Sequence, residues 1–451
     1  FDGHRSLILS HSKIGQLISR LLCGDITWLL HRFRFELGLL GSVPRPVPLV
    51  SRFAGALSGR RFGQGKSLKL LVFSHNLDCE GAPISLKELV CGLKTRHSVI
   101  PEVISFGDGP LRSEYEAHDI TVEVLPSVHH RISTMKRLDR EVESLAKRIQ
   151  ASAADVVFVN TLLNFPAILA AESAGVPSVW NPRESEPWDR YFRFLPDPVA
   201  QQAIAAIGLP RSVVFVAEAT RAVWKDFENS ANFTVIHNAL NLNRFAGKIL
   251  ENRATVRGSL GWSEDEVVFL CVGTLCERKG QKDALQALEK ITDLLRVPVR
   301  LVFVGDASLP YGQERQRFAL RFQGNNRGHI NFVDSTTDIC RYYLAADVFV
   351  LCSRVESYPR VVLEAMSFGL PIISTPVFGV VEQLPEPSDA YFYEPGDVGL
   401  LGKLMLEMAN KPIVRHRLSE CSKARFAEMP SFEEMLQAYE HVLRDAEKYA
   451  Y

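Results

Sequence analysis

The sequence predicts an α/β fold built from two doubly wound, Rossmann-like domains that follow each other along the chain. Short apolar runs alternate with helical runs from residue 68 onward, which is typical of parallel sheets covered by helices on both faces. The alternation restarts after a charged segment at residues 243–266, so we expect a second sheet there. A chain of 451 residues is also longer than one hydrophobic core usually supports.

The first domain is expected over residues 67–242. Leu86, Leu89 and Leu93 recur at helical spacing after a glycine-containing loop, which predicts a helix behind the first strand. The other predicted helices include residues 136–151 and 165–174. The predicted strands are residues 68–74, 98–105, 121–125, 155–160, 177–180, 213–216 and 234–237.

The second domain is expected over residues 243–430, and a C-terminal helix over residues 431–451. Its predicted strands are residues 267–272, 299–304, 330–333, 348–351 and 371–374, and its predicted helices are residues 281–295, 338–345, 361–368 and 398–408. Ligands of such sheets bind beyond the carboxyl ends of the strands. We therefore expect the two domains to face each other across a cleft that holds the site.

Composition excludes several classes of function. The 52 Lys and Arg residues balance the 52 Asp and Glu residues, so no overall field favours nucleic acid as a partner. The eight cysteines contain no C-x-x-C pair, which indicates reduced thiols of a cytoplasmic protein and no zinc site. No run of eighteen apolar residues occurs, so we expect no membrane-spanning helix.

Residues 1–66 differ from the rest of the chain. They carry ten Lys and Arg residues against three Asp and Glu residues, with apolar residues at helical spacing. One interpretation is a basic amphipathic segment that makes peripheral contact with the inner face of an anionic membrane. The other is a helical linker packed on the body or leading to a further domain. The first residue is Phe1, so we expect the chain to be part of a longer polypeptide.

The most informative stretch is residues 356–364, which carries Glu356 and Glu364. An apolar run at residues 347–352 precedes it, so Glu356 lies in a strand-to-helix loop and Glu364 about one turn inside the helix. A helix start presents unpaired N–H groups and a positive dipole end, which suits a phosphate. A diphosphate held there would have a sugar near each carboxylate, so the layout favours a nucleotide-sugar.

Two adjacent cations, Arg278 and Lys279, follow the predicted strand at residues 267–272. Cations are disfavoured at helix starts, so this position favours diphosphate binding over a solvated helix end. Gly81, after the first strand, would let the backbone approach a ligand closely, although a plain turn explains it as well. Gly305 ends another strand in a tight turn and by itself indicates little.

Residues 235–397 resemble the retaining GT-B glycosyltransferases of the glycogen-synthase and mannosyltransferase group, family 4. The matching motifs are residues 235–245, 272–280, 304–306, 345–350, 356–371 and 393–397. The first domain resembles the same family more loosely, through residues 81–83, 107–110 and 183–185.

The resemblance implies a role for each matching residue. Lys279 and Arg278 would act with Glu356 as the catalytic set: Lys279 would grip the donor diphosphate, and Glu356 would hold hydroxyl groups of the transferred sugar. Glu364 would hold the nucleotide ribose, and Gly81 would let the first domain close on the phosphates. The implied donor-binding residues are Gly81, Ala82, Thr274, Gly305, Tyr358, Pro359, Arg360, Val361 and Glu364, and the acceptor-side candidates are Asn160, Arg183 and Glu184.

The implied function is transfer of a hexose, with retention, from a UDP- or GDP-linked sugar to a glycan or lipid-linked acceptor in bacterial surface polysaccharide synthesis. The family implies neither a bound metal nor another cofactor. Many relatives have Arg at the position of Thr274, so Arg278 would supply the charge missing there. Some relatives have His near the position of Asn160, which is a separate departure from the family pattern. Two alternatives remain open: a catalytically silent, nucleotide-sugar-binding scaffold of a polysaccharide-assembly complex, and a GT-B phosphorylase or epimerase.

Overall fold

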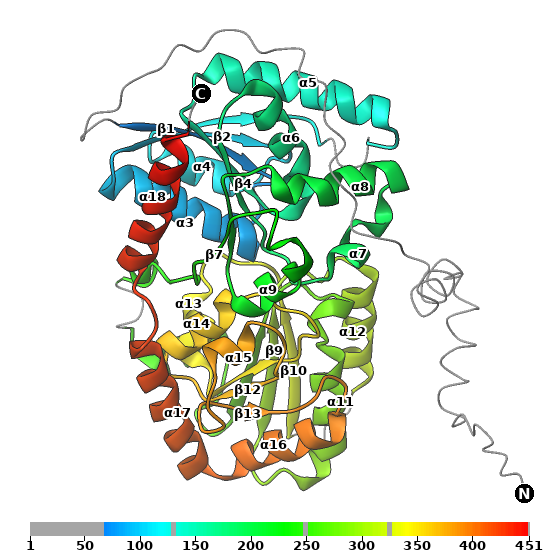
Figure 1. The fold of residues 1–451 in the computed structure, drawn as a ribbon. Coiled ribbons are helices and arrows are strands. Elements are labelled where there is room, and N and C mark those ends of the chain that lie inside the picture. The colour runs from blue at the N-terminus through cyan, green and yellow to red at the C-terminus, as the bar shows by residue number, and fades with distance from the viewer. Residues whose placement is uncertain (1–66, 128–131, 247–250, 323–326, 450–451) are drawn as a thin grey trace, which may run out of the picture. The chain divides into compact units, whose positions relative to one another are not determined.

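The computed structural model of the protein describes residues 67–127, 132–246, 251–322 and 327–449, all within one unit of the chain, Pro46–Tyr451 (Figure 1). The predicted basic segment at residues 1–66 lies outside the described residues. None of the helices in the described ranges is both long and apolar enough to cross a bilayer.

Within the described residues, the first parallel sheet has seven strands in the order β3-β2-β1-β4-β5-β6-β7. The strands are β1 (Leu68–Ser74), β2 (Val99–Ser105), β3 (Thr121–Val124), β4 (Val156–Asn160), β5 (Ser178–Asn181), β6 (Ser212–Phe215) and β7 (Phe233–Val235). The helices of this part are α3 (Gly81–Arg96), α4 (Leu111–Glu116), α5 (Met135–Ser152), α6 (Phe165–Ala174), α7 (Trp188–Tyr191), α8 (Asp197–Ala205) and α9 (Glu218–Ala222). Short 3-10 turns are η1 (Leu162–Asn164), η2 (Phe192–Phe194), η3 (Ala206–Gly208), η4 (Lys225–Phe227) and η5 (Leu242–Phe245).

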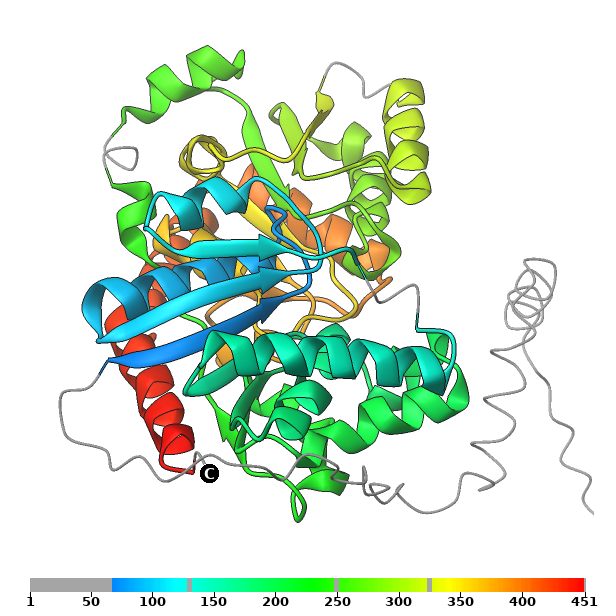
Figure 2. The ribbon, with the colours of Figure 1, turned by 90° about the horizontal axis from the view of Figure 1, so that it is seen from above.

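Helices cover both faces of this sheet because successive side chains of its strands point to opposite sides. Leu71 and Phe73 of β1 pack in one core with α5, α6 and α8. Leu70 and Val72, their neighbours in sequence, pack in the other core with α3, α4 and α18 (Phe432–Glu447). Figure 2 shows α5 on one side of the sheet and α3 with α18 on the other.

The second parallel sheet has six strands in the described part of the chain, in the order β10-β9-β8-β11-β12-β13. They are β8 (Val267–Val272), β9 (Val299–Val304), β10 (Gly328–Val333), β11 (Val348–Leu351), β12 (Ile372–Ser374) and β13 (Tyr391–Phe392). The helices are α10 (Arg253–Leu260), α11 (Lys282–Ile291), α12 (Pro310–Arg321), α13 (Cys340–Ala345), α14 (Arg360–Ser367), α15 (Val380–Gln383), α16 (Val398–Asn410) and α17 (Pro412–Ala427), with turns η6 (Glu277–Lys279) and η7 (Thr292–Leu294).

The same division into two cores occurs here. Val268 and Leu270 of β8 pack with residues of α13 and α14, whereas Val267 and Phe269 pack with residues of α11 and α16. The predicted α/β fold with two doubly wound, Rossmann-like sheets is confirmed. Helices α10 and α12 and strand β13 were not predicted from the sequence.

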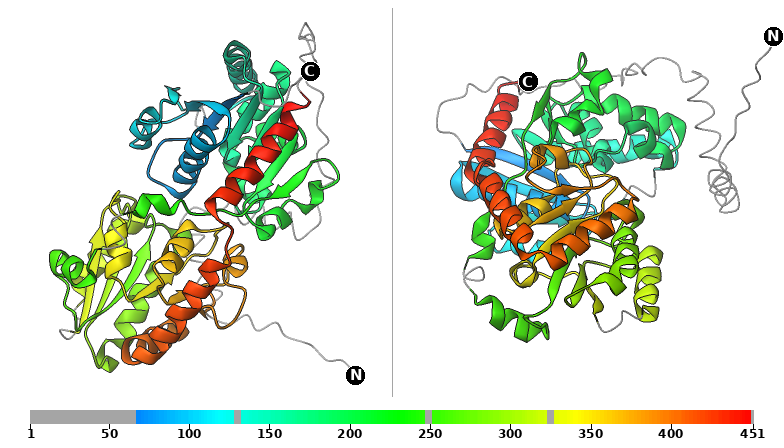
Figure 3. Two further views of the ribbon diagram at one scale, coloured as in Figure 1. Left: turned by 90° about the vertical axis from the view of Figure 1, so that its left-hand side faces the viewer. Right: turned by 90° about the horizontal axis from the view of Figure 1, so that it is seen from below.

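The last helix returns to the first sheet (Figure 3). Ser431 caps α18 through a reciprocal capping box with Glu434. Leu436 of α18 lies so close to α3 that a Cβ at Gly92 would stand 2.8 Å from it. A separate C-terminal helix was predicted over residues 431–451. In the structure, α18 packs against the first sheet and completes its core.

Candidate functional site

The candidate residues follow the strands at which the strand order of each sheet reverses. In the first sheet β1 lies between β2 and β4, and in the second sheet β8 lies between β9 and β11. Open parallel sheets bind ligands at the carboxyl ends of such strands. Gly81 follows β1, Asn160 ends β4, Lys279 follows β8 and Glu356 follows β11, so these four residues belong to loops of that kind.

Glu356 lies buried between the β11 and α14 elements, and its carboxylate is held by the neighbouring loop. Lys279 Nζ donates to its Oε1 at 2.5 Å, and Ser353 Oγ donates to the same oxygen at 2.6 Å. The Arg278 guanidinium is 4.0 Å from the other oxygen and donates to the Val355 carbonyl at 3.1 Å. The predicted catalytic residues Lys279, Arg278 and Glu356 are therefore brought together in one cluster.

The electrostatics of this cluster favour a carboxylate. Burial acts to raise the pKa of the Glu356 carboxyl, but the charges of Lys279 and Arg278 and the bonds from Lys279 and Ser353 outweigh it and lower that pKa below its usual value. The loop also requires a glycine at its end, since Gly280 has φ 63° and a Cβ there would stand 2.2 Å from the Cys352 carbonyl.

Glu364, inside α14, is buried and engaged on both oxygens. Arg244 Nη1 donates to Oε1 at 3.0 Å, and the Tyr343 hydroxyl donates to Oε2 at 2.9 Å. Arg360 lies 3.8 Å from Oε1, but its guanidinium makes two bonds of 3.0 Å to Glu88 of α3. The side chain of Arg360, a predicted donor contact, is thus occupied by a carboxylate from the first domain.

Three further donor-side candidates, Gly81, Gly305 and Ala82, have small side chains or none, so they present mainly their backbone. Gly81 is the first residue of α3, and a Cβ there would meet nothing within 4 Å, so its surroundings are open. Gly305 has φ 152°, and a Cβ there would stand 2.4 Å from the Gly273 carbonyl, which brings it against the loop of Thr274. The Ala82 carbonyl is 3.5 Å from Asn160 Nδ2.

Tyr358, Pro359 and Val361 surround the start of α14. The Tyr358 side chain is buried and stacks on His237 with ring centroids 4.7 Å apart, so it packs within the protein. Pro359 is the N-cap residue of α14 and its carbonyl accepts a bond from Gln383. Val361 follows Arg360 in the first turn, so a ligand near this helix start would meet backbone N–H groups there.

The acceptor-side candidates form a connected group in the first domain. Arg183 Nε donates to Asn160 Oδ1 at 3.1 Å, and Arg183 Nη1 donates to Asn238 Oδ1 at 2.5 Å. Glu184 accepts from the backbone N–H groups of Leu162 and Arg183 at 3.0 and 2.8 Å. Burial raises the pKa of the Glu184 carboxyl despite these bonds.

Hydrogen bonds join this group to the loop of Glu356. Ser357 Oγ donates to the Arg183 carbonyl at 2.6 Å, and Ser185 Oγ donates to Ser357 Oγ at 2.9 Å. Asn238 Nδ2 donates to the Tyr358 carbonyl at 3.0 Å. The acceptor-side candidates and the donor-side loop therefore lie beside each other.

Sequence reasoning missed several residues of this region. Arg244 and Tyr343 hold Glu364, Glu88 holds Arg360, and Ser353 holds Glu356. One usable signal was the cation Arg360 at a helix start, where the dipole disfavours it, because a cation there requires a partner.

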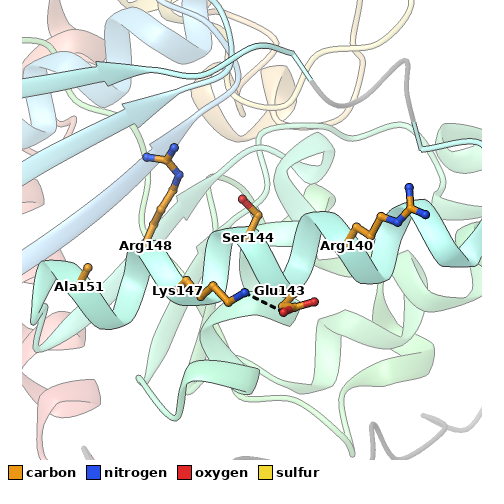
Figure 4. Close-up of a pocket in the computed structure, with 6 residues that line it drawn as sticks. All are labelled: Arg140, Glu143, Ser144, Lys147, Arg148 and Ala151. Carbon is orange, nitrogen blue, oxygen red and sulfur yellow. Dashed lines mark hydrogen bonds and ion pairs between the residues drawn. The ribbon is translucent and has the colours of Figure 1, made fainter.

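A surface hollow elsewhere does not compete with this region. It lies along the outer face of α5, and its lining side chains come from that single helix (Figure 4). Lys147 and Glu143 pair there at 2.8 Å, which is an ordinary exposed helix pair. Among the described residues, no group of three His, Cys, Asp or Glu side chains is arranged to hold a metal ion.

Comparison with known proteins finds a family match in the second half of the chain. Residues 252–425 match the sequence model of the family described as "Glycosyl transferases group 1", and this range contains Lys279, Glu356 and Glu364. The match lies within the second domain.

Two relatives illustrate the similarity. The chain is 25% identical over 258 residues to a GDP-mannose-dependent monoacylated alpha-(1-6)-phosphatidylinositol monomannoside mannosyltransferase of Corynebacterium glutamicum, covering 55% of this chain and 66% of that protein. It is 24% identical over 319 residues to a UDP-Gal:alpha-D-GlcNAc-diphosphoundecaprenol alpha-1,3-galactosyltransferase of Escherichia coli, covering 69% of this chain and 81% of that protein. The chain spans two thirds or less of the length of several curated relatives that it matches.

Solved structures share the fold. The structure of Anabaena HepE in complex with UDP-glucose matches with a TM-score of 0.70 and 19% identity, covering 84% of this chain and all of that one. At this level of identity the likeness shows the fold, which is the predicted GT-B arrangement of two Rossmann-like domains.

Proposed function

We propose that this chain is a glycosyltransferase that moves a hexose, with retention of configuration, from a UDP- or GDP-linked sugar to a glycan or lipid-linked acceptor. The observation that carries the proposal is the cluster of Lys279, Arg278 and Glu356 beside the start of α14, within the residues that match the glycosyltransferase family. The similar proteins named for GDP-mannose and UDP-Gal support the two donor types, and those named for phosphatidylinositol and diphosphoundecaprenol acceptors support a lipid-linked acceptor.

The cluster suggests how a donor would bind. Lys279 pairs with Glu356 at 2.5 Å, and a donor diphosphate would take over the ammonium group because it carries more negative charge. Arg278, which is half-exposed, would add a second positive charge. Glu356 would keep its bond from Ser353 and turn its freed lone pairs to hydroxyl groups of the sugar.

The reaction needs stabilisation of a nucleoside diphosphate leaving group. The two cations and the N-terminal end of α14 would stabilise the charge that develops as the bond from the anomeric carbon to the phosphate oxygen breaks. The acceptor hydroxyl would form its new bond on the same face and pass its proton to the departing phosphate oxygen. This step retains the anomeric configuration and consumes no metal or redox partner.

The experiment is a thermal-shift panel of UDP-, GDP-, ADP- and dTDP-sugars followed by a turnover assay. A donor at 100 times its dissociation constant should stabilise the protein by about 2.7 kcal/mol. Release of nucleoside diphosphate in the presence of a glycan or lipid-linked acceptor, and loss of that release in Lys279→Ala, is the expected result. A chain that no nucleotide-sugar stabilises would contradict the proposal.

A second candidate is a silent subunit that binds a nucleotide-sugar and scaffolds a polysaccharide-assembly complex. Thr274 favours it, because the resemblance placed an arginine at this position in many relatives. Thermal stabilisation by a donor without any hydrolysis or transfer would support this candidate over the enzyme.

A further inference from the structure

Glu364 is held in one orientation before any ligand binds. The Arg244 guanidinium donates to Oε1 at 3.0 Å and the Tyr343 hydroxyl donates to Oε2 at 2.9 Å, so each oxygen has one protein donor. Burial, followed by the nearby Glu364 charge, raises the pKa of Tyr343 well above its usual value, so its hydroxyl remains a donor at neutral pH.

Aromatic packing fixes both donors. The Arg244 guanidinium lies over the Phe245 ring, 4.9 Å from its centroid. Phe245 meets Phe368 edge to face at 5.3 Å, and Phe368 stacks on Tyr343 at 5.5 Å. Because these rings form one continuous contact between the two donors, neither can change position without disturbing the other.

The first domain also contributes to this arrangement. Glu88 of α3 lies 3.5 Å from the Arg244 guanidinium and makes two bonds of 3.0 Å with Arg360. Glu88, Arg360 and Glu364 are all buried, so their charges are poorly screened by water. Two carboxylates and two guanidinium groups balance in this network. Arg360 bonds to Glu88 and lies 3.8 Å from Glu364, whereas Arg244 bonds to Glu364 at 3.0 Å and lies 3.5 Å from Glu88.

A count of lone pairs indicates what the arrangement can bind. A carboxylate accepts about four hydrogen bonds, two on each oxygen. Arg244 occupies one position on Oε1 and Tyr343 one on Oε2, which leaves one free position on each oxygen. Two neighbouring acceptors on one rigid group match the two adjacent hydroxyls of a ribose.

We propose that Arg244 is a positioning residue that fixes Glu364 so that the donor site selects nucleoside diphosphates with an intact ribose. This inference rests on the proposed function, since it assumes that the nucleotide lies against α14. Arg244 itself touches no reacting atom in this proposal; it acts through the carboxylate that it orients.

The test compares UDP with 2′-deoxy-UDP, and GDP with 2′-deoxy-GDP, by titration calorimetry on the full chain. Wild type should bind the ribonucleotide about tenfold or more tightly, the effect of one hydrogen bond to a charged group. Arg244→Gln should reduce this preference to about threefold or less, because the carboxylate is then free to turn. Arg244→Lys, which keeps a cationic donor, should retain most of the preference.

Two further variants separate positioning from general damage. Tyr343→Phe keeps the ring but removes the donor to Oε2, so it should also lower the preference and serves if Arg244→Gln does not fold. Arg148→Gln removes an exposed ion pair between α5 and Glu123 of β3 and should leave the preference unchanged.

Each result decides a different point. A ribose preference that Arg244→Gln and Tyr343→Phe leave intact, or a wild type without any preference, overturns the inference while nucleotide binding itself still supports the proposed function. A wild type that binds neither UDP nor GDP overturns the proposed function and this inference with it.

Discussion

The pair of Glu88 and Arg360 gives a sharp prediction because it links the two domains through a buried contact. Glu88→Ala would leave the Arg360 guanidinium with Glu364 at 3.8 Å in place of two bonds of 3.0 Å. Arg360 is only 7% exposed, so water cannot replace the lost acceptors. Breaking such a buried pair from one side costs about 3–5 kcal/mol, mostly because a charge is left uncompensated.

This loss of folding free energy corresponds to a decrease in melting temperature. Unfolding entropy near 2.1 cal/mol/K per residue, summed over a cooperative unit of roughly 400 residues, predicts a decrease of about 4–6 °C. Lys87→Ala is the matched control, since Lys87 is the preceding residue of α3 and pairs with the more exposed Glu114. That pair is worth about 1 kcal/mol or less, or roughly 1 °C.

The assay is differential scanning calorimetry of wild type, Glu88→Ala, Arg360→Ala and the double variant. Because both single changes break the same contact, the double variant should be less destabilised than the sum of the two by about 1.5 kcal/mol or more. Additive effects, or a loss in Glu88→Ala no larger than that in Lys87→Ala, would refute the coupling between α3 and α14 inferred from the geometry.

Four further outcomes are expected. Lys279→Ala should weaken UDP or GDP binding on the order of ten- to a hundredfold, since a charge-assisted contact to phosphate is lost, and unchanged calorimetric affinity would place the diphosphate elsewhere. Glu356→Gln should reduce turnover more than nucleotide affinity, because in the proposed function this carboxylate binds hydroxyl groups of the sugar; equal losses in kcat and binding would contradict that role. The folded-state pKa of Glu356 lies below its usual value of 4.5, so the pairing of its carboxylate stabilises the fold at neutral pH. That contribution disappears as the pH falls through the lowered pKa. In a thermal-shift series, the difference in melting temperature between wild type and Glu356→Gln should therefore shrink below about pH 4.5. In vesicle flotation with anionic lipid, we expect little binding by the full chain or by a version that starts at Lys66, and salt-sensitive flotation of the full chain alone would instead support a membrane role for residues 1–66.

The sequence predicted the elements that depend on local pattern. The apolar run at residues 348–351 is β11, and the helical spacing at residues 361–368 became α14 (Arg360–Ser367), one residue earlier at each end. Glycines with positive φ, such as Gly280 and Gly305, stand where the motifs require tight turns. These features follow from periodicity and backbone geometry, which are properties of neighbouring residues.

Other features could not be predicted because they depend on residues far apart in the chain. The partners of Glu364 come from residues 244 and 343, and the partner of Arg360 is Glu88, more than two hundred residues away. Short helices such as α10, with eight residues, contain few apolar side chains, and β13 has two residues. Contact with a sheet, not propensity, decides whether such a short segment becomes a strand.

The return of α18 to the first sheet makes the two domains unequal as independent modules. The family match, residues 252–425, ends before α18 begins, so the second domain is a continuous piece of sequence. The first domain is not, because Leu436 and Tyr439 of α18 lie in its core. Residues 67–242 expressed without α18 would expose that apolar surface and aggregate. Co-expression with a peptide containing Phe432–Glu447 would cover the surface again and keep the domain in solution. Fragment studies and domain exchanges with related proteins therefore need to carry the end of the chain together with its beginning.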